Sequence, residues 1–226
     1  RRGQYDRAED LFEEALSVRR QHFGERHLSV ANSLNLLGGV RHKQGAHAQG
    51  AANLRRAIAL YRELLGDDHV YVASGLNKLG TLQMDAGQFT AAEATLNEAL
   101  AIVQTQFTAP HPRTADVLAS LGALHMARDR PALAAPLLRE ALTIRKDVLG
   151  PIHRQTVDVQ VALGGCLTAM QRFNEAETLL LTSRDVLSQQ ASPHGDDLRR
   201  VHAHLEALYR AWNRPQQAAA FAEAMP

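Results

Sequence analysis

The stretch that decides the fold is residues 79–100, with the sequence LGTLQMDAGQFTAAEATLNEAL. Apolar residues recur every three or four positions within it, as in Leu96, Ala99 and Leu100. That spacing places them on one face of a helix, whereas Gly87 interrupts the pattern with a residue type that favours turns. The stretch therefore predicts two amphipathic helices that form a hairpin.

The same pattern recurs along the chain at a step of 42 residues. Small or turn-prone residues occupy the Gly87 position in every copy: Gly3, Gly45, Gly87, Asp129, Gln171 and Asn213. Leu37, Leu79, Leu121 and Leu163 are each followed by a glycine, namely Gly38, Gly80, Gly122 and Gly164. A glycine inside a helix costs about 1 kcal/mol in propensity. Four in register therefore predict a close approach between paired helices, with Leu54, Leu96, Leu138 and Leu180 filling the space beside them.

A second series of breaks falls between the hairpins, at Gly24, Gly66, residues 110–112 and residues 150–151. The breaks predict eleven helices: a lone second helix at about 4–23, four full pairs and a final pair from about 195. We expect one array, divided into a half repeat (1–27), four repeats (28–69, 70–111, 112–153 and 154–194) and a degenerate capping repeat (195–226).

The order of Leu79-Gly80, Ala92, Leu96 and Ala99 resembles the tetratricopeptide repeat (TPR). The 42-residue period and the segments LGDDH (65–69) and LGPIH (149–153) resemble the longer repeat of kinesin light chains. The resemblance implies an all-α fold, a right-handed α-solenoid of antiparallel helix pairs whose first helices line a concave groove. The paired asparagines frequent in that groove remain only as Asn35 and Asn77, so a kinesin-type cargo specificity is not implied.

The first helix suggests an exposed apolar surface, and the C-terminal residues suggest a link to a larger protein. Leu11, Ala15, Leu16 and Val18 would lack a partner helix, so we expect an exposed apolar strip and a protein that extends upstream of Arg1. The strip could instead mediate self-association, or be an artefact of truncation. Residues 208–215 resemble the ends of repeat regions fused to bacterial serine/threonine protein kinases, and heavy use of Ala and Arg is associated with a bacterial source.

Composition narrows the classes of partner. Lys and Arg total 25 against 24 Asp and Glu, which disfavours nucleic acid as a partner. No apolar run reaches the roughly 20 residues of a bilayer span, so we expect no membrane association. The lone Cys166 favours a reducing compartment, and we expect a cytoplasmic protein.

The residues that could bind a metal or act in catalysis have simpler structural explanations. His27, His69, His111 and His153 lie one repeat apart, too far to share a zinc ion, and read as turn or helix-start residues. His202 and His204 should point to different helix faces, whereas Asp67-Asp68-His69 reads as helix capping. Cys166 occupies an apolar column and reads as a buried hydrophobe rather than a nucleophile. We find no catalytic constellation and expect no cofactor or metal.

What remains is a surface on the first helices. Its candidate peptide-binding residues are Asn32, Asn35, His42, Ser74, Asn77, Lys78, Thr81, Met84, Asp116 and Met126. Asparagine amides can bond a peptide backbone, and methionines offer apolar contact, although an ordinary solvated helix face is the alternative. We expect a non-catalytic scaffold that binds a peptide segment or partner protein in this groove. The alternative is the C-terminal recruitment region of a larger bacterial enzyme, such as a serine/threonine protein kinase.

Overall fold

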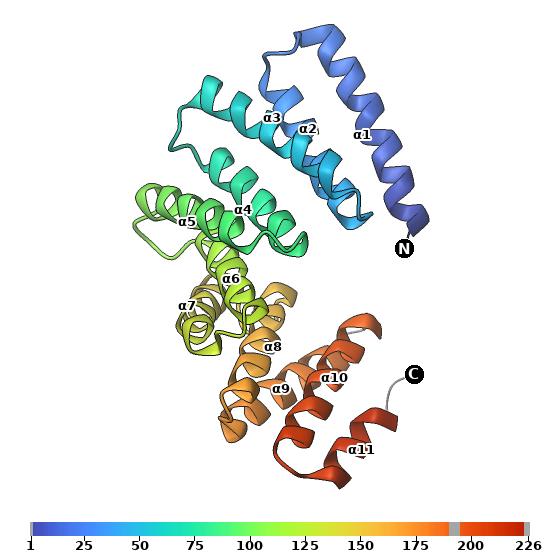
Figure 1. Ribbon diagram of the computed structural model, residues 1–226, viewed down its shortest axis with the longest axis vertical. Coiled ribbons are helices and arrows are strands. Elements are labelled where there is room, and N and C mark those ends of the chain that lie inside the picture. The colour runs from blue at the N-terminus through green and yellow to red at the C-terminus, as the bar shows by residue number, and fades with distance from the viewer. Residues whose placement is uncertain (1, 190–194, 224–226) are drawn as a thin grey trace. The chain divides into compact units, whose positions relative to one another are not determined.

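The computed structural model describes residues 2–189 and 195–223, which contain eleven α-helices and no strand. The predicted all-α solenoid is confirmed (Figure 1). Residues 1, 190–194 and 224–226, which the predicted first, fifth and capping repeats include, lie outside this part of the chain. The helices are α1 (Arg2–Phe23), α2 (Leu28–Lys43), α3 (His47–Leu65), α4 (Val70–Asp85), α5 (Phe89–Gln106), α6 (Pro112–Ala127), α7 (Pro131–Leu149), α8 (Arg154–Ala169), α9 (Phe173–Ser188), α10 (Gly195–Ala211) and α11 (Pro215–Glu223). Within these ranges no helix is long and apolar enough to span a bilayer.

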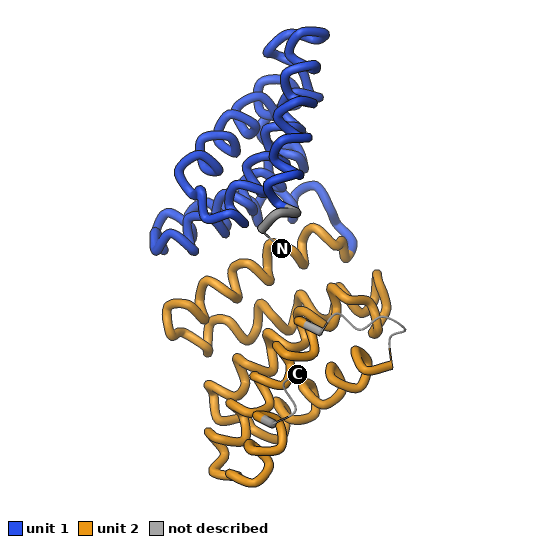
Figure 2. Tube along the Cα trace, turned by 90° about the vertical axis from the view of Figure 1, so that its right-hand side faces the viewer, with its two compact units in different colours: residues 1–109 blue, residues 110–226 orange. Residues whose placement is uncertain are grey.

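The chain divides into two compact units, unit 1 (1–109) and unit 2 (110–226), shown in different colours in Figure 2. In unit 1, α2 pairs with α3, α4 pairs with α5, and α1 packs on α2. The backbones of the first helices α2 and α4 also come close to each other, whereas the second helices α3 and α5 are linked by the side-chain ion pair of Arg62 and Glu98. We call the surface of α2 and α4 the inner face of unit 1. By the same criterion, α6, α8 and α10 form the inner face of unit 2.

A glycine on the first helix and a leucine on the second hold each of the four middle pairs together. A Cβ built on Gly80 would lie 2.6 Å from Cγ of Leu96, a side chain with no exposed surface. The corresponding contact distance is 2.7 Å in the pairs Gly38 with Leu54, Gly122 with Leu138, and Gly164 with Leu180. Because real Cβ atoms do not approach so closely, each glycine is required by packing, as the sequence predicts.

The turn inside each hairpin repeats the same backbone geometry. The residue at the Gly87 position has a positive φ: 83° at Gly45, 74° at Gly87, 55° at Asp129, 59° at Gln171 and 57° at Asn213. The next residue donates its N–H five residues back, as from Ala46 N to Arg41 O (2.8 Å), which is the Schellman ending of a helix. The left-handed conformation is free of strain only for glycine, so Asp129, Gln171 and Asn213 bear a cost.

The histidine column begins four of the first helices. Nδ1 of each ring accepts a hydrogen bond from the backbone N–H two residues later, at 3.1 Å for His27 and His69 and 3.2 Å for His111 and His153. These histidines are helix N-caps, which confirms the helix-start prediction. The segment Asp67-Asp68-His69 is a turn that caps α4, as predicted, with His69 as the N-cap and the two exposed acids in the turn before it.

Helix α1 carries part of the predicted apolar strip. Leu11 and Val18 are each 57% exposed, and Ala15 is half-buried. The residues that match Val18 one, two and three repeats later are at most 7% exposed: Leu60, Ile102 and Ile144. The prediction for Leu16 is wrong: its side chain is buried, since it faces α2, the neighbour that is present.

Aromatic rings close the C-terminal pair of unit 2. Trp212 stacks on Phe173 of α9, with ring centroids 5.4 Å apart, and the Arg214 guanidinium carbon lies 3.5 Å from the centre of its ring. Tyr209 stacks on Phe221 of α11 at 5.7 Å and donates its hydroxyl to Glu177 at 2.7 Å. Burial, followed by the Glu177 carboxylate, raises the pKa of Tyr209 to about 12. Rings thus hold the short α11 to α10, and the turn that precedes α11 to α9, in place of the glycine–leucine contact.

Candidate functional site

Two asparagines lie one repeat apart on the inner face of unit 1. Asn35 on α2 and Asn77 on α4 are half-buried, and the Oδ1 atom of each is fully buried without a hydrogen-bond partner. Leaving a buried polar atom unpaired costs about 1–3 kcal/mol. Each side chain is only half-buried, so an outward turn of either amide would bring an unpaired group within reach of a ligand.

The other candidates of unit 1 surround this pair. Lys78 donates its ammonium to the backbone carbonyl of Asn35 at 3.5 Å, and Thr81 donates its hydroxyl to the carbonyl of Asn77 at 2.9 Å. Asn32 is exposed, and its Oδ1 accepts the Tyr61 hydroxyl of α3 at 2.7 Å. The half-buried residues Ser74 and Met84 complete the α4 side of the face. Seven of the predicted residues, the two asparagines included, thus lie on α2 and α4, and Lys78 and Thr81 bond the backbone of the asparagine pair.

His42 lies differently from the other candidates. Its side chain is only 8% exposed, and Nε2 lies 2.8 Å from Oδ2 of Asp85 at the end of α4. Its ring also lies 5.6 Å from that of His47. His42 thus ties the C-terminal turn of α2 to that of α4 instead of presenting its ring to solvent.

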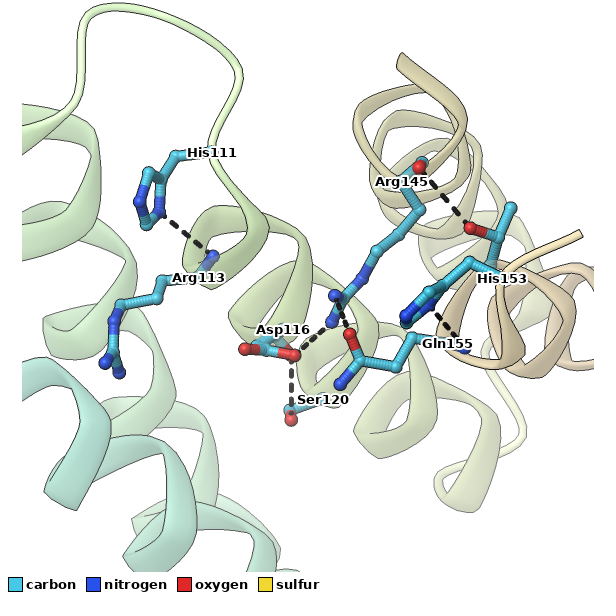
Figure 3. A network of polar contacts seen from close by, with 8 residues as sticks. His111, Arg113, Asp116, Ser120, Arg145, His153 and Gln155 are labelled. Carbon is cyan, nitrogen blue, oxygen red and sulfur yellow. Dashed lines mark hydrogen bonds and ion pairs between the residues drawn. The ribbon is translucent and has the colours of Figure 1, made fainter. Parts of the chain in front are cut away.

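Asp116 belongs to a polar network within unit 2 (Figure 3). Arg145 of α7 is 3% exposed; it pairs with the Asp116 carboxylate on α6 and donates to Oε1 of Gln155 on α8 at 2.6 Å. Burial raises the pKa of Asp116, and the Arg145 charge opposes that rise. The carboxylate is thus the internal counter-ion of a buried guanidinium, a role that sequence reasoning missed.

Met126 lines a pocket on the inner face of unit 2, with a volume of about 330 Å³. Its walls come from four helices: Ala123 and Met126 of α6, Leu138 of α7, Ala162, Gly165 and Thr168 of α8, and His204 and Ala207 of α10. Sequence reasoning did not assign Leu138 or His204 to a site. The available signal was the run of Ala123, Gly165 and Ala207, small residues exactly one repeat apart on successive first helices.

The remaining chemical candidates have structural roles. Cys166 is fully buried, and its thiol donates to the Pro131 carbonyl at 3.3 Å. Burial raises the pKa of this thiol, which keeps it in the less reactive protonated form. His202 lies 5.6 Å from the ring of Phe221, whereas His204 faces Gly165, so the two point in different directions as predicted. Within residues 2–189 and 195–223, no three His, Cys, Asp or Glu side chains gather as metal ligands.

Several solved structures share the fold. BtubC (BKLC) from P. vanneervenii is 18% identical, with a TM-score of 0.81 over 98% of this chain and 89% of that one. A protein of Podosopora anserina described as a putative kinesin light chain, with nearly identical TPR-like repeats, is 22% identical, with a TM-score of 0.65 over 83% of this chain and 88% of that one. YrrB, described as a TPR protein with an unusual peptide-binding site, is 16% identical, with a TM-score of 0.54 over 92% and 89%. At these identities the likeness shows the fold alone.

The comparison with curated proteins gives no match. A family model described as tetratricopeptide repeat matches three overlapping stretches of the sequence, residues 1–63, 29–105 and 71–147. Together they span residues 1–147, well over half of the chain. The helix hairpins, their glycine–leucine contacts and this match agree, and the chain belongs to the tetratricopeptide repeat family.

Proposed function

We propose that the chain is a non-catalytic, cytoplasmic protein-interaction module that binds an extended peptide segment on the inner face of unit 1. The observation that carries the proposal is the pair of buried, unsatisfied amides at Asn35 and Asn77. Once the two half-buried side chains turn outward, peptide N–H groups would supply the donors that these oxygens lack, and the amide nitrogens could donate to peptide carbonyls in turn. Such contacts are independent of the peptide's side chains.

The spacing of the two asparagines suits an extended chain. Neighbouring packed helices lie about 8–10 Å apart. Three residues of an extended strand cover about 10 Å. A peptide lying across α2 and α4 would therefore meet Asn35 and Asn77 with backbone groups about three residues apart. Thr81 and Met84 would then contact its side chains. In this arrangement Asn32 and Ser74 offer further polar contacts, whereas His42 holds the ends of the two helices in place.

Related structures support a role in protein interaction in general. YrrB is described as having a peptide-binding site, and it and the TPR-like repeats of the Podosopora protein share the fold of this chain. The fold by itself hosts many partners, so the choice of a peptide rests on the two amides.

The test is a binding measurement on an Asn35→Ala/Asn77→Ala double variant. Peptides of 12 residues selected from a random displayed library on the intact chain would be labelled, and their affinities measured by fluorescence anisotropy. Loss of two hydrogen bonds, each contributing about 0.5–1.5 kcal/mol, should weaken binding by about tenfold or more. Pull-downs from a cell lysate should lose partner recovery in parallel.

The matched control is Asn97→Ala/Gln104→Ala, which removes two exposed amides from α5. Its affinities should equal those of the unaltered chain, and both variants should retain the helical circular dichroism signal. Unchanged peptide affinity in a folded Asn35→Ala/Asn77→Ala variant would reject this face as the binding site.

A second proposal follows from α1, whose exposed Leu11 and Val18 form a patch suited to self-association between two copies. Sedimentation should show a dimer that Val18→Asp converts to a monomer. Val148→Asp, which alters another exposed valine (42%) on α7, should leave the dimer intact. A chain that stays monomeric at about 100 µM, a concentration well above the dissociation constants of functional dimers, would refute the proposal. A dimer that disappears when sequence upstream of Arg1 is added would identify it as an artefact.

The C-terminal sequence favours the alternative that this interaction module is one region of a larger enzyme. Residues 208–215 form the end of α10 and the turn into α11, and they carry the resemblance to bacterial kinase-linked repeat regions. In that setting the array recruits partners to a larger multidomain enzyme. The reading frame upstream of Arg1 tests this: a kinase-like glycine loop and catalytic Asp would support it, and a start codon within about 40 codons would exclude it.

A further inference from the structure

The pocket of unit 2 exists because three successive first helices present very small side chains. Ala123, Ala162 and Ala207 are exposed around its mouth, and the fully buried Leu138 of α7 contributes to its lining. In unit 1 the positions that match Ala162 carry the large residues Leu36 and Lys78. The column of Ala123, Gly165 and Ala207 continues into unit 1 as Gly39 and Thr81, so the larger side chains at 36 and 78 are what distinguish unit 1 from the pocket of unit 2.

His204 shapes the wall of the pocket on the α10 side. A Cβ added to Gly165 would lie 2.9 Å from Cε1 of His204 and 3.0 Å from its Nδ1, so the ring occupies the space that a side chain at 165 would fill. Burial, with a further contribution from Arg200, lowers the pKa of His204. The ring is thus neutral at pH 7 and can donate one hydrogen bond and accept one.

None of the residues that line the pocket carries a charge, and charged side chains elsewhere on its helices pair with each other. Asp116 pairs with Arg145, and Arg200 pairs with Asp158. Arg154 pairs with Asp197, and Arg210 pairs with Glu206. A charged group entering the pocket would lose its hydration without gaining a counter-ion, which is costly. The charge pattern therefore selects an uncharged occupant, and the alanine, methionine and leucine walls select an apolar one.

We infer that this pocket binds one large, uncharged apolar side chain, of the size of Leu, Met or Phe, from a segment of a partner protein. Its volume of about 330 Å³ corresponds to roughly ten water molecules, enough for one such side chain. Thr168 and His204 both line the pocket. The Thr168 hydroxyl donates to the Gly164 carbonyl at 2.9 Å and can accept from a peptide backbone, whereas the neutral His204 ring can donate or accept. The site is separate from the asparagine pair of unit 1 and does not depend on it.

The experiment fills the pocket in the intact chain. Ala123→Leu adds bulk at an exposed helix position, and leucine has nearly the helix propensity of alanine, so folding should be preserved. Ala132→Leu makes the same change at an exposed position of α7 outside the pocket and is the matched control. Random 12-residue displayed peptides would be selected on the unaltered chain, with counter-selection against Ala123→Leu. Ala207→Leu fills the pocket from another exposed position, and it keeps the inference testable if Ala123→Leu does not fold.

Selected peptides should share one Leu, Met, Ile or Phe, and substituting that residue by Ala or Lys should weaken binding by about tenfold or more. Both filling variants should weaken binding by a similar factor, whereas Ala132→Leu should not. In ¹³C-methyl spectra of the intact chain, the Met126, Ala162 and Ala207 methyl signals should shift on addition of the peptide.

Two results would overturn the inference. Either no selected peptide would bind the unaltered chain more tightly than the filling variants, or the selected peptides would bind without needing an apolar residue. The Asn35→Ala/Asn77→Ala variant should bind these peptides normally. Failure at unit 1 and failure at the pocket of unit 2 are therefore told apart by which variant changes the affinity.

Discussion

At the scale of single residues, two neighbouring glycines of α2 should respond to alanine in opposite directions. A Cβ on Gly38 would lie 2.7 Å from Cγ of the buried Leu54, whereas a Cβ on Gly39 meets nothing within 4 Å. Gly38→Ala should therefore lower the free energy of unfolding by about 1–3 kcal/mol through overpacking. Gly39→Ala should raise it by up to about 1 kcal/mol through helix propensity.

Urea denaturation of the two variants, followed by circular dichroism, measures both effects, and each variant serves as the control of the other. Equal shifts of the midpoint in the same direction would show that Leu54 yields to the added methyl group and that the glycine column is not required by packing.

The N-cap at His111 should make stability depend on pH. Burial, reinforced by Arg113 and opposed by Asp116, lowers the pKa of this ring below 6.5. As the pH falls below 6.5 the unfolded chain takes up a proton before the folded chain does, so stability is lost on acidification. Protonation also places a hydrogen on the Nδ1 atom that accepts from Arg113 N.

His111→Asn keeps an acceptor at the cap and removes the titration. Its melting temperature should fall less than that of the unaltered chain between about pH 7.5 and about pH 5.5. His22→Asn, which alters an exposed histidine that caps no helix, should behave like the unaltered chain. A fall as large in His111→Asn as in the unaltered chain would assign the acid sensitivity to other groups.

The residue scale is also where sequence reasoning was weakest. Asp116 was predicted to contact a peptide, yet it pairs with Arg145, whose counterparts in neighbouring repeats are Tyr61, Val103 and Leu187. A pairing that occurs in one repeat leaves no periodic signal in a single sequence. The same holds for His204 and Leu138, since the pocket depends on what four helices leave unfilled.

At the scale of elements, the sequence predicted most of what the structure shows, because every hairpin solves the same packing problem. The step of 42 residues repeats the glycine–leucine contact in four hairpins and the left-handed turn residue in five. Recognising the turn in one hairpin therefore locates the helix ends in the other four. The exception is the final pair, where α11 is held by aromatic rings instead of the glycine–leucine contact.

The stability of that final pair should be changeable without changing the stability of the other helices. The fluorescence of Trp212, the single tryptophan, reports on its unfolding. Arg214→Ala removes the guanidinium 3.5 Å from the centre of the indole ring, a contact that contributes about 0.5–1 kcal/mol or more. In a linear repeat array, stability is a sum of local terms. The midpoint of the fluorescence transition should therefore fall, while the main circular dichroism transition stays in place.

Arg210→Ala is the matched control, since Arg210 is an exposed arginine of α10 that pairs only with Glu206 among the described contacts. It should leave the fluorescence midpoint unchanged. If Arg214→Ala shifted the fluorescence and circular dichroism midpoints equally, the cap and the remaining helices would unfold as one cooperative block.

At the scale of the whole molecule, the two compact units carry different candidate surfaces. Unit 1 holds the unsatisfied asparagines, and every residue that lines the apolar pocket lies in unit 2. Each unit also has its own buried glycine–leucine pairs, so each contains the contacts that a separate core requires. Binding of an apolar anchor therefore needs no residue before 110.

This independence predicts that a fragment of residues 110–226 folds and retains the pocket's peptide affinity, whereas a fragment of residues 1–109 folds without it. Circular dichroism melting establishes folding, and fluorescence anisotropy with the selected peptides gives each affinity. Ala123→Leu in the 110–226 fragment should reduce its affinity by the same factor as in the intact chain. A folded 110–226 fragment that binds at least about tenfold more weakly than the intact chain, a difference of about 1.4 kcal/mol, would show that the anchor site is completed from outside unit 2.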